Sequence, residues 1–170
     1  DSFHLNFSQI GIITLVFQLS ASILQPLVGM YTNKKSHAYS LPLGMGLTLI
    51  GLLCLSQAPS YAMILVSVML IGMGSSIFHP ESSRVAYLAS GGRRGLAQSI
   101  FQLGGNAGSA LGPLLAAWII VPQGQKSISW FGIGALLAIV ILLKVGGWYK
   151  KQMLTRLATR KHAGTGHPEF

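Results

Sequence analysis

The sequence predicts an all-α polytopic membrane protein with five transmembrane helices, and three observations support that prediction. Hydrophobic residues make up 51% of the 170 residues and charged residues only 9%, whereas soluble domains carry about 25% charged residues. Long uncharged runs recur along the chain, and about 20 apolar residues are enough to cross a bilayer as a helix. The basic residues stand in short clusters between these runs, as they do in multi-pass membrane proteins.

The uncharged runs and the breaks between them place the five helices. No fixed charge occurs between Asp1 and Lys34, and the next uncharged stretch, which ends at Glu81, is too long for one span. Turn-forming residues mark the remaining loops at 57–60, 90–94 and 122–126. The expected helices are residues 10–30, 40–56, 61–88, 95–120 and 129–147. Residues 1–150 then form the transmembrane part, and residues 151–170 form a basic cytoplasmic tail or linker, disordered from about residue 163.

The basic residues also predict the orientation. One side of an alternating five-helix topology collects eleven of the twelve Lys and Arg residues: Lys34, Lys35, Arg84, Arg93, Arg94, Lys144, Lys150, Lys151, Arg156, Arg160 and Lys161. The other side has only Lys126. Because short basic loops stay in the cytoplasm, we expect residue 1 to be periplasmic and the C-terminal tail cytoplasmic. An outside start on an odd number of spans also leads us to expect a further helix before residue 1.

The composition argues against several other kinds of site. The net charge of +9 alone favours nucleic acid, but the basic residues are not interleaved with aromatic residues on a polar face. The single cysteine, Cys54, lies in an apolar run and cannot form an internal disulfide. The five histidines are scattered, and no nucleophile–base pair, phosphate loop or pair of carboxylates occurs. We therefore expect no metal, no cofactor, no nucleic-acid partner and no enzymatic activity.

The stretch most suggestive of function lies in the third expected helix, where His79, Pro80, Glu81 and Arg84 interrupt a long uncharged run. Ionisable residues inside a membrane span are costly and mark functional sites by default. Glu81 and Arg84 are i, i+3 neighbours and can neutralise each other. We therefore expect Glu81 or His79 to carry protons, with Arg84 as counter-charge or anion contact. The alternative is a structural ion pair at the cytoplasmic boundary, beside a histidine that is merely packed. Pro80 is expected to kink or break the helix.

Polar side chains form stripes on two helices. On the fourth helix, Gln98, Gln102 and Asn106 recur every four residues and share one face. This stripe either lines an aqueous cavity or forms hydrogen bonds between helices, and the spacing favours neither. Gln18, Ser22 and Gln25 form a shorter stripe on the first helix, with Pro26 beside it, and hydrogen bonds between helices are slightly favoured there.

Glycines form a second stripe on the fourth helix, on the face opposite to the glutamines. Gly104, Gly108 and Gly112 recur every four residues and are followed by Pro113. Small residues at this spacing let two transmembrane helices approach closely, so we expect a helix-packing face. Further close-packing positions are expected at Gly44, Gly46, Gly51, Gly72 and Gly74.

Two of these patterns resemble motifs of the major facilitator superfamily. The loop after the first helix, with Gly29, Asn33 and Lys34, resembles the family's G-x-x-x-D-[RK]-x-G-[RK]-[RK]. Asn33 replaces the acid of that motif, and Ser36 replaces its second glycine. The segment Gly108-x-x-x-Gly112-Pro113 resembles the family's antiporter motif. The runs 78–86, 89–102 and 109–117 resemble bacterial antibiotic-efflux members of the superfamily.

The resemblance implies that these five helices are helices 2 to 6 of a twelve-helix transporter, a partial N-terminal six-helix bundle without its first helix and C-terminal half. It also implies proton-driven efflux of a small-molecule drug across the bacterial inner membrane, with Glu81, Arg84, Gln98, Gln102 and Asn106 at the cavity or the coupling site. The alternative hypothesis is a non-transporting membrane module or subunit that pairs through its glycine faces.

Overall fold

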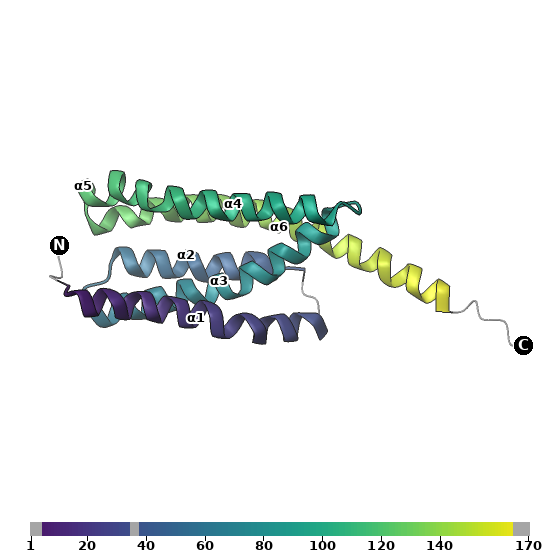
Figure 1. Ribbon diagram of the computed structural model, residues 1–170, viewed down its shortest axis with the longest axis horizontal. Coiled ribbons are helices and arrows are strands. Elements are labelled where there is room, and N and C mark those ends of the chain that lie inside the picture. Colours follow the sequence, from purple (N-terminus) through teal and green to yellow (C-terminus); the bar gives the residue numbers. More distant parts are fainter. Residues whose placement is uncertain (1–4, 35–37, 165–170) are drawn as a thin grey trace, which may run out of the picture.

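The computed structural model describes residues 5–34 and 38–164, with side chains from residue 5 to 30 and from 38 to 155. The secondary-structure elements of these described residues are all helices or helical turns, and the long helices lie side by side along one axis (Figure 1). The elements are α1 (Phe7–Lys34), α2 (Ser40–Ser56), α3 (Tyr61–Ala89), α4 (Arg94–Leu115), the π-helical turn η1 (Ala116–Ile120), α5 (Val121–Gln123), the 3₁₀ turn η2 (Gln125–Ser127) and α6 (Ile128–Gly164).

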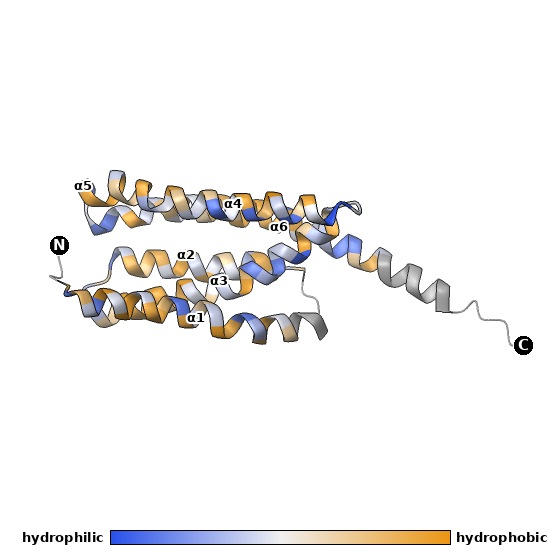
Figure 2. Cartoon of the chain, in the orientation of Figure 1, coloured by the Kyte–Doolittle hydropathy of each residue, from blue (hydrophilic) through white to orange (hydrophobic). Residues whose placement is uncertain are grey.

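Four segments are long and apolar enough to cross a membrane: Phe7–Met30, Tyr61–Ala89, Arg94–Gln123 and Gln125–Thr155. The fifth helix, α2, has 17 residues, which is at the short end of the lengths that span the hydrocarbon. Apolar residues also cover the outward faces of the helices (Figure 2), as expected where lipid is the solvent. The predicted all-α membrane fold is confirmed.

The helix α3 lies at the centre of the packing. It contacts α1 on one side and α2 on another, and α2 also contacts α6. Glycines make these contacts close. A Cβ atom at Gly72 would come within 2.8 Å of the Phe17 carbonyl oxygen of α1, and one at Gly44 within 2.9 Å of the Gly74 carbonyl oxygen. The expected close-packing roles of Gly44, Gly51, Gly72 and Gly74 are confirmed, whereas Gly46 has no atom within 4 Å of its Cβ position.

Side chains close the end of the bundle at which α1 begins. The Tyr61 hydroxyl at the start of α3 donates a hydrogen bond to the Gln9 carbonyl oxygen of α1, at 3.1 Å. The Gln125 side-chain amide donates to the carbonyl oxygens of Leu55 and Ala58, at 2.8 and 3.0 Å. The Gln125 side chain thereby gives the Ala58 carbonyl oxygen, in the loop after α2, a partner. It adds a donor to the Leu55 carbonyl oxygen, which also accepts from the Ala58 backbone N–H at 3.4 Å.

The helix boundaries agree closely with the expected ones at the loops between helices, and less closely in α1 and α6, the first and last helices of the chain. The bounds of α2 are as predicted, and α3 ends one residue later. The π-helical turn η1 follows Pro113, and the fourth span continues through it to Gln123. The sixth helix runs on through Trp148 to Gly164, so the expectation that the ordered chain ends before residue 163 is wrong for residues 163 and 164. Residues 165–170 lie outside the described part.

The helix α4 differs from the others because no residue in it is buried. Its main contact with the other helices is with α3, near the loop that joins the two. Cβ atoms at Gly104, Gly108 and Gly112 would meet no atom within 4 Å. The glycine face expected to pack against a helix is therefore open in the part of the chain that the structure describes.

Candidate functional site

The only acidic side chain within the described residues is Glu81, and it is 1% exposed. It stands on the face of α3 that contains Gly74 and Ile77, at i+7 and i+4 from them, and both of these residues contact Gly44 of α2. The Arg84 Nη1 atom lies 3.5 Å from Glu81 Oε1, and the Arg84 side chain is 24% exposed. The expected i, i+3 pair is therefore present on α3.

The pair leaves one carboxylate oxygen without a hydrogen bond. Glu81 Oε1 is buried and has no hydrogen-bond partner among the described residues. Its separation from Arg84 is too long for a charge-assisted hydrogen bond, which spans about 2.7–2.9 Å. Buried polar atoms are nearly always satisfied, so each exception requires an explanation.

The depth of Glu81 follows from the course of α3. The helix continues from Tyr61 to Ala89 with Pro80 inside it, so a break at Pro80 is excluded. Eight residues separate Glu81 from the last residue of the helix, or about 12 Å at 1.5 Å per residue. The carboxyl group therefore lies well inside the helix that is long enough to cross the bilayer.

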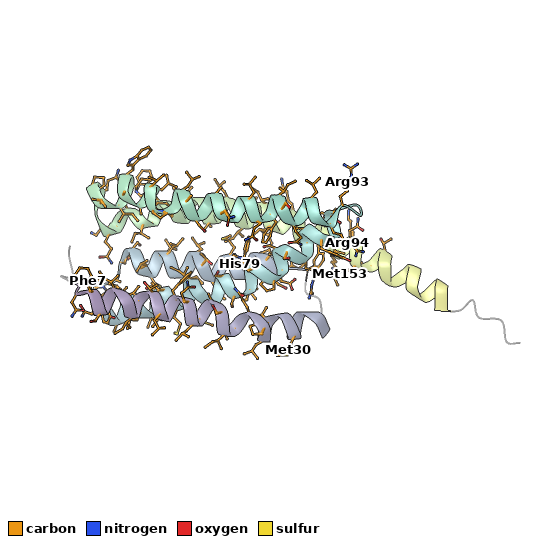
Figure 3. The ribbon with its side chains drawn as sticks, in the orientation of Figure 1. Phe7, Met30, His79, Arg93, Arg94 and Met153 are labelled. Atoms are coloured by element: carbon orange, nitrogen blue, oxygen red, sulfur yellow. The ribbon has the colours of Figure 1, made fainter. Side chains whose placement is uncertain are left out.

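The structure separates His79 from the ion pair. Two residues along a helix correspond to a rotation of about 200°, so His79 and Glu81 face opposite sides of α3. His79 is exposed, and its labelled side chain lies near the middle of the bundle (Figure 3). Its ring packs edge-to-face on Phe78, with centroids 6.4 Å apart. The three residues that the sequence groups together thus form an ion pair with a buried carboxylate on one face of α3 and an exposed imidazole on another.

A hydrogen-bonded contact joins α3 to α4. The Ser83 hydroxyl donates to Gln98 Oε1 at 3.1 Å, and Gln98 Nε2 donates to the Ser83 carbonyl oxygen at 3.0 Å. Gln98 therefore does make a hydrogen bond between helices, one of the two roles expected for its stripe. Sequence reasoning missed Ser83, although its i+4 spacing from His79 places both residues on one face of the helix.

The other stripe residues do not converge on Glu81. Gln102 and Asn106 are exposed on α4, Gln18 is exposed on α1, and Gln25 is half-buried there. Of the loop motif, Gly29 has no atom within 4 Å of its Cβ position. Asn33 and Lys34 end α1, and their side chains lie outside the described part. The described residues contain no group of three or more His, Cys, Asp or Glu side chains that could hold a metal.

The fold and this intramembrane site agree with the comparison to known proteins. A model of the Major Facilitator Superfamily matches residues 1–166. The chain belongs to the major facilitator superfamily. It is 59% identical over 152 residues to the fosmidomycin resistance protein of Escherichia coli (strain K12). It is 48% identical over 152 residues to the uncharacterized MFS-type transporter YfnC of Bacillus subtilis (strain 168). No solved structure matches the chain.

The alignments cover 89% of this chain and 37% of each of these two relatives. The chain therefore spans little more than a third of the length of these two relatives. The expected membership of a family of non-enzymatic membrane transporters is confirmed.

Proposed function

We propose that the full-length protein is a proton-coupled secondary active transporter that exports a small-molecule drug, a fosmidomycin-like antibiotic, across the bacterial inner membrane. The similarity to a relative named for fosmidomycin resistance supports the class of substrate. The buried carboxyl group of Glu81 supports the proton as the coupling ion. In this proposal residue 1 is periplasmic and the C-terminal tail is cytoplasmic.

The observation that carries the proton role is the Glu81 oxygen without a hydrogen bond. A carboxyl group can take up and release a proton. Because no hydrogen-bond donor occupies this oxygen atom, it can accept that proton. Arg84 beside it, at 3.5 Å, stabilises the charged form when the proton leaves. The two protonation states then differ in the strength of the contact between Glu81 and Arg84, and this difference can favour different conformations of the transporter.

The lack of a packing partner for α4 among the described residues is also explained by this proposal. The relatives are much longer than this chain, and we propose that a first helix and the C-terminal half of the same transporter cover α4. Within the described residues, α4 has no buried residue on either face. We therefore expect residues 1–170 alone not to transport drug, and proteoliposomes containing only this fragment to show no drug flux.

The test is Glu81→Gln in the full-length protein. Glutamine keeps the shape of the side chain but cannot carry a proton, so drug resistance and proton-driven flux should be lost while the protein still reaches the membrane. Resistance is read in cells that lack other drug exporters, and flux in proteoliposomes with an imposed pH gradient.

The matched control is Glu81→Asp, which retains the carboxyl group on a shorter side chain. We expect this variant to keep part of the proton-driven flux. Full drug resistance in Glu81→Gln cells, with normal amounts of protein in the membrane, would end the proton role of Glu81.

A further inference from the structure

The first turn of α2 lies level with Glu81 of α3. The two helices run in opposite directions, and a Cβ atom at Gly44 of α2 would lie 2.9 Å from the Gly74 carbonyl oxygen and 3.2 Å from the Ile77 Cβ atom. The helix backbones are therefore close together at this point. One helical turn further along each helix, the same register brings Glu81 level with Ser40, the first residue of α2.

The N-terminus of α2 has no cap among its own side chains. Its N-cap residue, Tyr39, makes no side-chain hydrogen bond to the first turn, and that turn contains no acidic residue. The first N–H groups of an α-helix have no partner within the helix and carry a partial positive charge. Leu41, the second residue of α2, is 4% exposed, so water has little access to this turn.

The carboxyl group of Glu81 is an independent observation at the same place. It is 1% exposed, and its Oε1 atom has no hydrogen-bond partner among the described residues. This burial is a minimum, because parts of the transporter outside this chain can only cover the group further. Glu81 shares its face of α3 with Ile77, which contacts Gly44, so the buried carboxyl group is directed toward the start of α2.

Glu81 is the only acid that the start of α2 can meet within the described residues. Its ion-pair partner, Arg84, is on α3 itself, and α2 contains no charged residue. On α4, the Arg94 guanidinium lies over the Tyr87 ring, 4.6 Å from its centroid. Lys35 and His37 precede α2 and lie outside the described residues. The other charged or titratable residues at this end of α1 and of the part of α6 that packs with α2 are Tyr31, Lys34, Lys144, Tyr149, Lys150 and Lys151.

We propose that the ionised Glu81 carboxylate is the electrostatic partner of the α2 N-terminus, and that its protonation loosens the first turns of α2. This inference rests on the proposed proton coupling and names the element that responds to the proton. The carboxylate takes a proton from water, one O–H bond forms, and the negative charge is lost. The attraction between that charge and the positive end of α2 is lost with it.

Hydrogen–deuterium exchange of the full-length protein in detergent tests the loosening. Glu81→Gln should speed the exchange of amides 40–46 by about two- to thirtyfold, the range to which helix-dipole energies correspond. Amides 51–56, at the other end of α2, are the internal control and should not change. Glu81→Asp keeps the carboxyl group and should stay close to the unmodified protein.

The pH dependence separates a proton-responsive contact from a purely structural one. After correction for the effect of pH on chemical exchange, acidification of the unmodified protein should speed the exchange of amides 40–46, and Glu81→Gln should remove this step. An unmodified protein without such a step would overturn the inference. This measurement needs no variant, so it decides the question even if Glu81→Gln does not fold.

A new cap on α2 tests whether the helix N-terminus is the partner of Glu81. Tyr39→Asp supplies a carboxylate to the same N–H groups, so Glu81→Gln in this background should no longer speed the exchange of amides 40–46. Tyr39→Ala removes the same ring without adding a cap, and in this matched control Glu81→Gln should keep its full effect. An equal effect of Glu81→Gln in both backgrounds would overturn the assignment.

Exchange and transport report on separate claims. Loss of drug resistance in Glu81→Gln with unchanged exchange would leave the proton role of Glu81 intact and overturn its link to α2. Faster exchange with full drug resistance would support the link between Glu81 and α2 and remove the proton role in transport.

Discussion

At the scale of single residues, burial decides which member of the ion pair the fold depends on. Glu81 is 1% exposed, whereas the Arg84 side chain keeps 24% of its surface. Removing one partner of a buried pair leaves the other uncompensated, at a cost of about 3–5 kcal/mol. A charge that retains contact with solvent suffers less from losing its partner than one that is enclosed.

We therefore predict that Arg84→Gln lowers the thermal stability of the full-length protein in detergent more than Glu81→Gln does. Arg84→Gln leaves an enclosed carboxylate, with a loss approaching about 3 kcal/mol. The double variant should regain most of this loss, because neither charge remains. Equal losses of thermal stability in the two single variants would contradict the prediction that burial makes the two charges unequal.

Glycine packing leads to a second prediction at this scale. A Cβ atom at Gly74 would lie 2.5 Å from the Gly44 carbonyl oxygen and also overlap the Thr48 hydroxyl oxygen. Because backbone atoms cannot easily move aside, Gly74→Ala should destabilise the protein by about 1–3 kcal/mol, the usual cost of overpacking.

The matched control for Gly74→Ala is Gly134→Ala in α6, where a Cβ atom would meet nothing within 4 Å. Alanine is a better helix former than glycine by about 1 kcal/mol, so this variant should be neutral or stabilising. Melting temperatures from size-exclusion chromatography after heating measure both variants. A stable Gly74→Ala protein would contradict the observed helix spacing.

At the scale of helices, α4 is joined to the described bundle mainly through one polar contact. Gln98 exchanges two hydrogen bonds with Ser83, and no residue of α4 is buried. Hydrogen bonds between transmembrane helices contribute about 0.6 to 1.7 kcal/mol each. The contact is therefore a large part of what holds the N-terminal half of α4 against α3.

We predict that Gln98→Ala destabilises the full-length protein by about 1–2 kcal/mol, following the measured range for such bonds. Gln102→Ala, one turn along the same stripe, should leave thermal stability unchanged, because Gln102 is exposed and makes no hydrogen bond within the described residues. The same melting measurements compare the two. A double-mutant cycle with Ser83→Ala isolates the side-chain bond, and a coupling energy of zero would contradict it.

Helix boundaries show how far local sequence determines an element. The bounds of α2 followed from the turn residues on either side of it, because Pro and Ser at 57–60 stop a helix locally. The end of α6 did not follow, because the change from apolar to basic residues after Trp148 marks the edge of the membrane and not the end of a helix. Polarity and helicity are separate properties, and composition reports only the first.

At the scale of the whole molecule, the basic residues gather at one end of the bundle. Arg93 and Arg94 lie at the end of the bundle from which the long C-terminal part of α6 extends (Figure 3). Phe7, at the start of α1, lies at the opposite end. The alternating arrangement assumed for the positive-inside rule is therefore the observed one. Which end faces the cytoplasm remains a prediction from the charges.

Labelling of intact cells checks that orientation in a full-length protein whose natural cysteines, Cys54 included, are replaced by alanine. Gln57→Cys, in the exposed loop between α2 and α3, should react with an impermeant thiol reagent from outside the cell. Arg93→Cys, exposed in the loop between α3 and α4, should react only after the membrane is permeabilised. The reverse pattern would invert the proposed topology.

The sequence by itself determined the membrane environment, the number of helices, most of their boundaries and the pairing of Glu81 with Arg84. These properties depend on local composition and on spacing along one helix, which the order of residues contains directly. Only the tertiary structure decided that Glu81 is enclosed while His79 is exposed, that Gln98 bonds to Ser83, and that the glycines of α3 are packed while those of α4 are open. Each of these depends on which neighbouring helix lies on which face, and helices far apart in the sequence meet only when the chain has folded.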